Sequence, residues 1–194
     1  MKIYFEKVSE LVQNSPKIFD EWYNDVSPDK QARIDRISDI SRRNTLILSD
    51  HLARKAVSRF CNILEKDVVF RYNSHGKPFY PEEGVHFSIS HSGNYVVCCI
   101  DEKPCGIDIE TVRDVDLRTA RRFCTENEIE FINSSNDRQS AFLYIWTRKE
   151  AYFKSMGCGI ATVLRAVDVL KTDGFETVMD NDYILSIFKS NIKF

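Results

Sequence analysis

The sequence predicts an α+β protein, in which helices and strands occur in groups and do not alternate regularly. A short alternating stretch opens the chain at residues 2–8, and three short strands follow one another over residues 86–110. Helical patterns lie on both sides of those three strands. Because a doubly wound sheet needs a regular strand–helix–strand order, the grouping favours α+β.

Composition and charge exclude several classes of protein. The 194 residues suffice for one large domain or two small ones, and the net charge of -2 argues against a nucleic-acid partner. No apolar run approaches the roughly 18 residues that a membrane-spanning helix needs, so we expect no membrane partner. The chain opens without a signal sequence and its six cysteines form no CxxC pair, which favours a reduced, cytoplasmic protein.

Periodicity defines the elements of the first part of the chain. It predicts a strand at residues 2–8, helices at 28–37 and about 41–61, and a strand at 68–72. In the longer helix the apolar residues recur at helical spacing, and Asp39 or Ser41 would cap its N-terminus. The glycine- and proline-containing stretch at residues 73–78 predicts a turn.

The second part of the chain follows the same reasoning. It predicts strands at residues 86–90, 95–100 and 105–110, helices at 116–123, about 125–133 and about 137–156, and strands at 166–171 and 183–189. Thr125 and Glu128 have the spacing of a capping box. Gly157 and Gly159 would end the long helix. A division near residues 100–104 gives two halves, 1–102 and 103–194, each with helix and sheet.

An acidic pair lies on the strand at residues 106–110. Because side chains alternate along a strand, Ile107 and Ile109 would face the core, whereas Asp108 and Glu110 would share the other face about 7 Å apart. Two like charges on one face are unfavourable without a compensating cation, and magnesium takes such oxygen ligands. The same pattern also fits a half-buried edge strand with a solvated acidic face.

The long helix at 137–156 carries the charges that could complete this site. Glu150 and Lys154 lie four residues apart and share a stripe, while Lys149 begins on an apolar stripe and must extend its ammonium towards a polar group. If the helix packs beside the strand, Glu150 completes a group of three carboxylates, flanked by two lysines that suit a phosphate. The alternative is a solvated surface pair between Glu150 and Lys154.

The ordered motifs resemble the paired signature of the 4'-phosphopantetheinyl transferases, of the larger two-halved type that includes the surfactin-synthetase activator. GIDIE at residues 106–110 is followed by WTRKEAYFK at 146–154, with GKP at 76–78 and SISHSG at 88–93 upstream. RFCTENE lies between the signatures, and GCGI follows at 157–160. The resemblance implies two similar-sized α/β halves packed as a pseudo-dimer, with nucleotide contacts in the first half and the magnesium site in the second.

The resemblance also assigns roles to individual residues. It implies that Asp108, Glu110 and Glu150 bind Mg²⁺, for which Mn²⁺ could substitute, and that Glu150 deprotonates the acceptor serine. Coenzyme A would be the substrate. The residues that would contact it are Lys77, Ser90, His91, Lys149, Lys154, Arg43 and Thr45, with Lys154 also steadying the leaving phosphate.

Each of the weaker assignments has an ordinary alternative. His91 could be a turn histidine and Lys77 a solvated turn lysine. The region of Arg42, Arg43 and Thr45 aligns with the family to within one residue and could equally be a polar helix opening.

The predicted reaction transfers 4'-phosphopantetheine from coenzyme A to a serine of an apo acyl, peptidyl or polyketide carrier and releases 3',5'-ADP. The protein would act as a monomer. Arg113, Arg118, Arg121 and Arg122 form a basic cluster that could meet an acidic carrier, or a solvated helix face. Two other functions fit the same fold: a non-catalytic coenzyme A- or carrier-binding module, and a different magnesium phosphotransferase or hydrolase.

Overall fold

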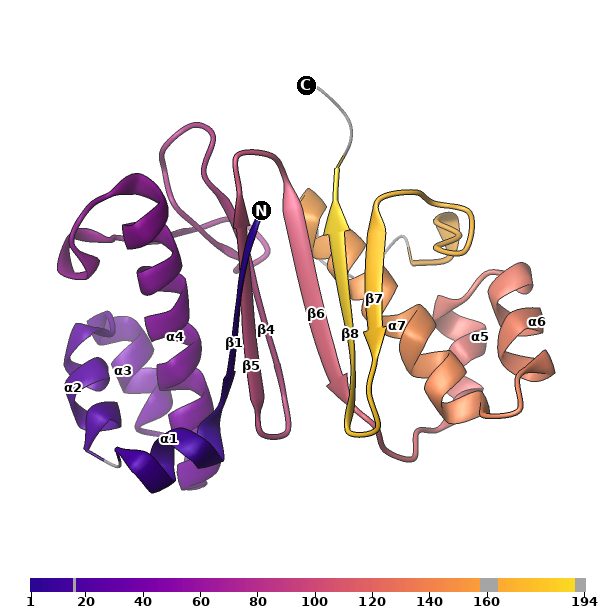
Figure 1. Ribbon diagram of the computed structural model, residues 1–194, viewed down its shortest axis with the longest axis horizontal. Coiled ribbons are helices and arrows are strands. Elements are labelled where there is room, and N and C mark those ends of the chain that lie inside the picture. Colours follow the sequence, from indigo (N-terminus) through magenta and orange to yellow (C-terminus); the bar gives the residue numbers. More distant parts are fainter. Residues whose placement is uncertain (16, 158–163, 191–194) are drawn as a thin grey trace.

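Two three-stranded antiparallel sheets lie side by side in the middle of the molecule, and helices cover their outer sides (Figure 1). The structure is a computed structural model that describes residues 1–15, 17–157 and 164–190. One sheet has the strand order β1-β5-β4 and the other β6-β8-β7. The six strands are β1 (Lys2–Lys7), β4 (His86–Ser92), β5 (Tyr95–Asp101), β6 (Cys105–Thr111), β7 (Phe175–Met179) and β8 (Tyr183–Lys189). The arrangement confirms the α+β class.

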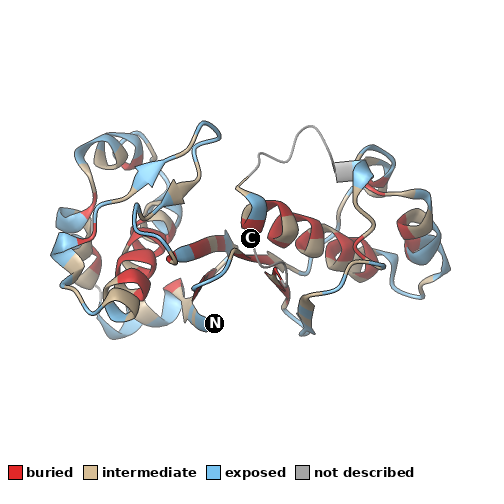
Figure 2. Cartoon of the chain, turned by 90° about the horizontal axis from the view of Figure 1, so that it is seen from above, coloured by how far each residue is buried: buried red, intermediate tan, exposed pale blue. Residues whose placement is uncertain are grey.

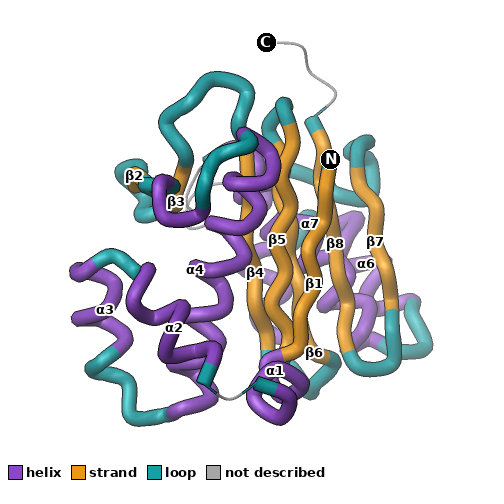
Figure 3. Tube along the Cα trace, turned by 60° about the vertical axis from the view of Figure 1, so that its left-hand side comes forward, coloured by secondary structure: helices purple, strands orange, loops and turns teal. Residues whose placement is uncertain are grey.

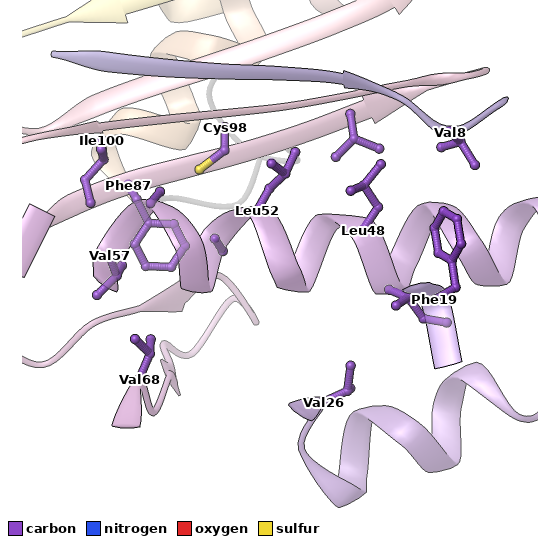
Figure 4. Packing of buried hydrophobic residues seen from close by; sticks show 14 of the residues in the cluster. Val8, Phe19, Val26, Leu48, Leu52, Val57, Val68, Phe87, Cys98 and Ile100 are labelled. Carbon is purple, nitrogen blue, oxygen red and sulfur yellow. The ribbon is translucent and has the colours of Figure 1, made fainter. Parts of the chain in front are cut away.

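The first sheet packs against one long helix. The helices of this part are α1 (Val8–Asn14), α2 (Ile18–Asp25), α3 (Pro28–Ile34) and α4 (Ile40–Cys61). Leu48 and Leu52 of α4 are fully buried and point towards the sheet, on the side of the helix where Cys98 of β5 lies, as Figure 4 shows. On the other side of α4, Val26 and Val68 complete the same core (Figure 4). The helix is therefore buried on two sides, which fixes its position firmly against the sheet.

The ends of α4 carry recognisable caps. The Asp39 side chain accepts hydrogen bonds from the backbone N–H groups of Ser41 and Arg42, as a helix N-cap does. Asn62 ends the helix in the left-handed conformation with φ 56°. Asp39 was one of the two predicted caps. The short 3-10 helix η1 (Glu65–Asp67) and the two-residue strands β2 (Arg71–Tyr72) and β3 (Pro78–Phe79) follow.

The second sheet packs against the other long helix, α7 (Arg138–Met156). The remaining helices of this part are η2 (Leu117–Thr119), α5 (Ala120–Phe123), α6 (Glu126–Ser134) and η4 (Leu164–Ala166). Thr125 and Glu128 form the predicted capping box at the start of α6. Gly157 ends α7 with φ 68°, whereas Cys158 and Gly159 lie outside the described residues. Buried residues gather in the strands and along α4 and α7 (Figure 2).

A third core cluster joins the two sheets. It contains Val97 and Cys99 from β5, Ile107 and Ile109 from β6, and Leu185 from β8 among its buried members. Because residues of both sheets share this cluster, the alternating isoleucines of β6 serve the junction between the sheets. Within the described part of the chain, no helix has the length and apolar character needed to cross a membrane.

The structure corrects one predicted strand. Residues 166–171 form the end of a 3-10 helix and a turn, and the strand lies later, at β7. Side chains satisfy the backbone here: the Lys149 ammonium donates to the Val167 carbonyl at 2.6 Å, and Glu128 accepts from the Val169 N–H at 2.9 Å. The Val169 carbonyl accepts from Arg148 at 3.2 Å. Because these backbone groups are already hydrogen-bonded to side chains, the segment cannot use them to pair with a neighbouring strand, despite its alternating apolar residues.

Smaller differences concern the first part of the chain. The strand expected at 68–72 is reduced to β2, the helix expected at 28–37 ends at Ile34, and α1 and α2 were not predicted. Helix α1 begins directly after β1, without an intervening turn, and its N-cap Lys7 makes no side-chain capping bond. No start signal in the sequence therefore marks it.

Candidate functional site

Asp108 is the centre of the site. Its neighbours Ile107 and Ile109 face the core cluster that joins the two sheets. The Asp108 side chain therefore points to the opposite face of β6, against α7. The residue as a whole is 4% exposed. Its Oδ1 accepts hydrogen bonds from Ser90 Oγ and Lys154 Nζ, both at 2.6 Å. Its Oδ2 is buried and has no hydrogen-bond partner in the described structure. Burial raises the pKa of Asp108 even though Lys154 opposes that shift.

Glu110 lies two residues further along the same face. Its Oε2 accepts hydrogen bonds from Ser92 Oγ at 2.9 Å and from the Arg113 guanidinium at 2.6 Å. The side chain is 18% exposed, so Glu110 forms the more open edge of the acidic pair.

Glu150 of α7 completes the acidic group. Its carboxyl is 8% exposed, and burial together with the charge of Asp108 raises its pKa to about 7. Lys154 lowers this pKa and Glu110 raises it further. Asp108, Glu110 and Glu150 therefore act on one another electrostatically, as the strand-and-helix arrangement predicts. Two like-charged carboxyls in a poorly solvated site favour a bound cation or a retained proton.

The acidic group is suited to a hard divalent cation but is not preassembled around one. Across residues 1–15, 17–157 and 164–190, no three His, Cys, Asp or Glu side chains are placed so that they could hold a metal ion. The oxygen donors and the unbonded, buried Oδ2 of Asp108 nevertheless fit such a cation. In this arrangement the Lys154 ammonium supplies the positive charge at Asp108.

A row of serines holds the acidic strand in place. Ser88, Ser90 and Ser92 alternate along β4, so their side chains share one face. Ser88 Oγ accepts from the Ile107 N–H at 3.2 Å, and Ser92 Oγ accepts from the Thr111 N–H at 3.1 Å. The serine hydroxyls thus connect β4 to β6, and Ser90 and Ser92 also donate to the two carboxylates. Ser88 and Ser92 were not predicted, although the S-x-S-x-S alternation was visible in the sequence.

A basic cavity lies within electrostatic range of the acidic group, because Lys154 and Glu110 both affect the pKa of His91, which lines this cavity. It has a volume of about 500 Å³ and is bounded by α3, α4, the β2–β3 hairpin and β4. In Figure 3 β4 is the edge strand of its sheet on the side of the β2–β3 hairpin. Lys30, Arg33, Arg42 and His91 line it, together with apolar side chains such as Leu46 and Ile89. Cationic groups beside an apolar wall suit a ligand with phosphates and a planar ring.

One of these residues is held by an ion pair, and the charge state of another is set by its surroundings. Lys30 Nζ lies 2.8 Å from Asp50 Oδ1, and the other oxygen of Asp50 accepts from Arg54 at 2.7 Å. Burial and the charges of Lys154, Arg42 and Lys30 lower the pKa of His91, which leaves its imidazole neutral at pH 7. Lys30 and Arg33 were missed from the sequence. Their spacing of three residues in a predicted helix was the available signal.

Lys149 is placed away from the acidic group. Its side chain is fully buried, and its ammonium lies 2.8 Å from the Glu128 carboxylate and donates to the Val167 carbonyl. The structure therefore directs Lys149 to α6 and the segment before β7, not to Asp108. The expectation that it extends from an apolar stripe towards a polar group is confirmed, but that group is Glu128.

Arg43 and Thr45 also lie away from the basic cavity. Arg43 pairs with Asp35 at 3.4 Å in a separate hollow, while the Thr45 hydroxyl donates to the Ser41 carbonyl within α4. Successive residues of a helix point about 100° apart, so Arg42 faces the cavity and Arg43 does not. A shift of one residue in the alignment exchanges Arg42 and Arg43.

Lys77 lies at the junction between the hairpin and α7. Its ammonium donates to the backbone carbonyl of Lys154, and Asn73 Nδ2 donates to the Gly157 carbonyl at 2.8 Å. Both contacts satisfy carbonyls at the C-terminal end of α7, where cations are stabilising. Lys77 lines a second cavity of about 310 Å³ and does not line the basic one, to which the same hairpin contributes Gly76 and Pro78.

Comparison with known families covers nearly the whole chain. Residues 104–187 match the family model described as the 4'-phosphopantetheinyl transferase superfamily, and residues 13–103 match one described as 4'-phosphopantetheinyl transferase, N-terminal.

Curated relatives agree with these matches. The chain is 37% identical over 145 residues to the 4'-phosphopantetheinyl transferase gsp of Aneurinibacillus migulanus, covering 74% of this chain and 61% of that protein. It is 33% identical over 153 residues to the 4'-phosphopantetheinyl transferase Sfp of Bacillus subtilis, covering 77% and 68%. The 4'-phosphopantetheinyl transferase psf-1 of Bacillus pumilus is 30% identical over 188 residues, covering 94% and 81%. This chain thus spans about three fifths of the gsp protein's length.

Proposed function

The chain belongs to the 4'-phosphopantetheinyl transferase family, and from that premise we propose that it transfers 4'-phosphopantetheine from coenzyme A to a carrier-protein serine. The carrier would be an acyl, peptidyl or polyketide carrier, and 3',5'-ADP would leave. The observation that carries the proposal is the basic cavity together with the buried carboxyls of Asp108 and Glu150. A nucleotide with phosphates fits the basic cavity, and a pyrophosphate bound through a cation fits the carboxyls.

Asp108, Glu110 and Glu150 would hold Mg²⁺ or Mn²⁺, as their oxygen donors and the unbonded Asp108 Oδ2 suggest. When bound, such a cation supplies Lewis-acid stabilisation of charge on the pyrophosphate. Lys30, Arg33 and Arg42 would bind the nucleotide phosphate in the cavity, with neutral His91 beside them. Ser90 would position the Asp108 carboxylate through its hydrogen bond, in addition to any contact with coenzyme A.

The transfer is a displacement at phosphorus. The carrier serine oxygen forms a bond to the β-phosphorus, and the bond from that phosphorus to the bridging oxygen breaks. The serine proton would pass to the Glu150 carboxylate, the group of the acidic site that the helix α7 supplies. Lys154 would stabilise the negative charge that develops on the leaving phosphate.

The two-halved organisation belongs to the same proposal. Each sheet carries one long helix, α4 or α7, and the two matched family models meet at residues 103 and 104. These features support a pseudo-dimer with a nucleotide-binding half at 1–102 and a catalytic half at 103–194. The monomeric state and the cytoplasmic location stay predictions.

The basic cluster expected to meet the carrier is partly engaged within the chain. Arg113 pairs with Glu110 at 2.6 Å, and Arg118 pairs with Asp116 at 2.7 Å. Arg121 and Arg122 of α5 are exposed. We therefore assign the contact with an acidic carrier to Arg121 and Arg122.

The proposal is tested by incubating the protein with Mg²⁺, coenzyme A and a panel of apo carriers, and then measuring the mass of each carrier. Glu150→Gln and Asp108→Ala should lower the rate of carrier modification by roughly 10²–10⁴-fold, the range expected for loss of a positioned acid–base group. Chelation should abolish the reaction, and added Mg²⁺ or Mn²⁺ should restore it.

The matched control is Glu176→Gln, which removes an exposed carboxylate on β7. It should leave the rate unchanged. Near-normal modification by the Glu150 or Asp108 variant, with the fold intact by circular dichroism, would contradict the assignment.

A further inference from the structure

The Lys154 ammonium lies where a cation is needed. It is 2.6 Å from Asp108 Oδ1, the Asp108 side chain is 6% exposed, and the Lys154 side chain is 25% exposed. Glu110 and Glu150 add two more acidic groups that interact with Asp108. Without a cation, these carboxyls would repel one another in a site that water screens poorly. Lys154 therefore neutralises part of the acidic group while no metal is bound.

A metal ion and this ammonium compete for the same carboxylate, because the ammonium lies on Oδ1 of Asp108 and the metal would take the unbonded Oδ2. A hard divalent cation bonds directly to carboxylate oxygens, and Oδ1 of Asp108 already accepts from both Ser90 and Lys154. Two cations held on one carboxylate also repel each other strongly at short range. Binding of a metal through Asp108 would therefore place two cations on one carboxylate, and their repulsion favours movement of the ammonium away from it.

The surroundings allow the side chain to move while its backbone stays fixed. Lys77 donates to the Lys154 carbonyl, and Asn73 donates to the Gly157 carbonyl, so the β2–β3 hairpin holds this end of α7. Gly76 and Pro78 of the same hairpin line the basic cavity. The Lys154 charge also acts on His91, which lines that cavity. The ammonium thus lies on Asp108 and within electrostatic range of a residue that lines the cavity, so a phosphate bound in the cavity can attract it.

We propose that Lys154 is an internal counter-cation that makes metal binding depend on coenzyme A. In the empty protein its ammonium neutralises Asp108 and weakens metal binding. When coenzyme A is bound, its phosphates attract the ammonium away from Asp108, and the carboxylates become free for the metal. This inference rests on the proposed function, because it takes coenzyme A and a divalent cation as the ligands. By linkage, the metal should strengthen coenzyme A binding by the same factor.

The test is calorimetric titration of Mg²⁺ into the full chain, without any carrier, in the presence and absence of coenzyme A. Lys154→Met should bind Mg²⁺ about tenfold more tightly than the unaltered protein when coenzyme A is absent, because one repelling charge is gone. Coenzyme A should increase the Mg²⁺ affinity of the unaltered protein by a larger factor than that of the variant.

Two further variants separate charge from structure. Lys154→Arg keeps a cation at Asp108 and should leave the coenzyme A-free Mg²⁺ affinity close to that of the unaltered protein. Lys189→Met removes a lysine paired with Asp101 at 2.9 Å and should have no effect on Mg²⁺ binding. If Lys154→Met does not fold, as judged by thermal melting, Lys154→Gln replaces it.

The outcomes also distinguish this inference from the proposed function. If the unaltered protein binds Mg²⁺ with coenzyme A but Lys154→Met binds Mg²⁺ no more tightly in its absence, the counter-cation role is wrong and the proposed function stands. If Mg²⁺ binds under no condition, both are wrong.

Discussion

Arg42 and Arg43 are adjacent in the chain and have different surroundings. Arg42 lines the basic cavity, whereas Arg43 forms an ion pair with Asp35. The sequence does not distinguish them, since both are arginines and both lie in the first turn of a helix. Their difference arises from the rotation of the helix and the position of α3 beside it.

The first prediction compares these two arginines. Arg42→Ala should weaken coenzyme A binding about tenfold, the change expected for loss of one charge-assisted contact. Arg43→Ala should leave the coenzyme A dissociation constant unchanged, because its charge is used by Asp35. Calorimetric titration of coenzyme A, without metal or carrier, measures both. Equal losses in the two variants would mean that general positive charge attracts the ligand and that the cavity does not select Arg42.

His51 shows how burial controls a charge at the residue scale. Its ring stacks on Trp22 with centroids 3.9 Å apart, and burial lowers its pKa from 6.5 to about 4. Its Nδ1 is 3.4 Å from Glu65, but an imidazole with this pKa is neutral at pH 7. The contact is therefore not an ion pair under ordinary conditions.

The second prediction concerns acid stability. Between pH 6.5 and about 4 the unfolded chain binds a proton at His51 that the folded chain does not, so the free energy of unfolding should fall as pH falls through this interval. His51→Phe keeps a ring over Trp22 and removes the titration. Urea denaturation at several pH values should give the variant a shallower decline than the unaltered protein. Identical slopes would contradict the assigned shift.

Lys149 shows that a residue of the sequence motif can stabilise the fold. It directly precedes Glu150, yet its ammonium is paired with Glu128 inside the protein. Glu128 in turn accepts hydrogen bonds from the N–H groups of Thr125 and Val169. One buried ion pair therefore joins α7, the start of α6 and the segment before β7. Removal of one partner alone would leave a buried charge uncompensated, which typically costs about 3–5 kcal/mol.

At the scale of elements, the contact of β6 with α7 sets the geometry of the acidic group. Gly106 makes this contact possible, because a Cβ at that position would lie 1.8 Å from the Ala151 backbone carbonyl. The strand and the helix therefore approach more closely than any other residue would allow. Asp108 follows two residues later on β6, and Glu150 precedes Ala151 on α7, so this approach also brings the carboxyls together.

The third prediction is that Gly106→Ala separates the two elements. The substitution should lower the free energy of unfolding by about 3 kcal/mol, the upper part of the usual range for overpacking. It should also weaken Mg²⁺ binding, since Asp108 and Glu150 move apart. Gly84→Ala is the control: a Cβ there meets nothing within 4 Å, but φ is +75°. It should cost about 1 kcal/mol for the left-handed backbone and leave Mg²⁺ binding unchanged.

At the scale of the whole molecule, the two sheets share one core cluster. Val97 and Cys99 of the first sheet and Ile107, Ile109 and Leu185 of the second are all buried in it. Phe5, Tyr95 and Tyr183 also form ring contacts across this junction, with centroids 5.0–5.6 Å apart. Neither sheet can lose its partner without exposing apolar surface.

The fourth prediction is that both sheets unfold in one cooperative transition. The chain has two tryptophans, Trp22 beside α4 and Trp146 on α7, so each half carries one fluorescent probe. Trp22→Phe and Trp146→Phe each leave a single probe, and the two variants should each show a denaturation curve that coincides with loss of total helix signal. Separate midpoints for the two signals within one variant would show that the halves unfold independently.

The class of fold, most of the strands and both long helices could be predicted from the order of the residues alone. Alternation along β6 assigned Ile107 to the core and Asp108 to the other face, because side-chain direction in a strand is a local property. The capping box at Thr125 and the end of α7 at Gly157 are local for the same reason. The ordered motifs also identified the family, which the comparisons confirm.

The pairing of the charged groups, by contrast, becomes visible only when the helices and sheets are packed together. Lys149 and Lys154 both belong to one motif, yet one ammonium lies on Glu128 and the other on Asp108. Lys30 and Arg42 face one cavity although they come from different helices, and the turn at residues 73–78 contacts the end of α7. Partner choice depends on how separate elements pack, and that is fixed by burial of the shared core and not by the identity of neighbours along the chain.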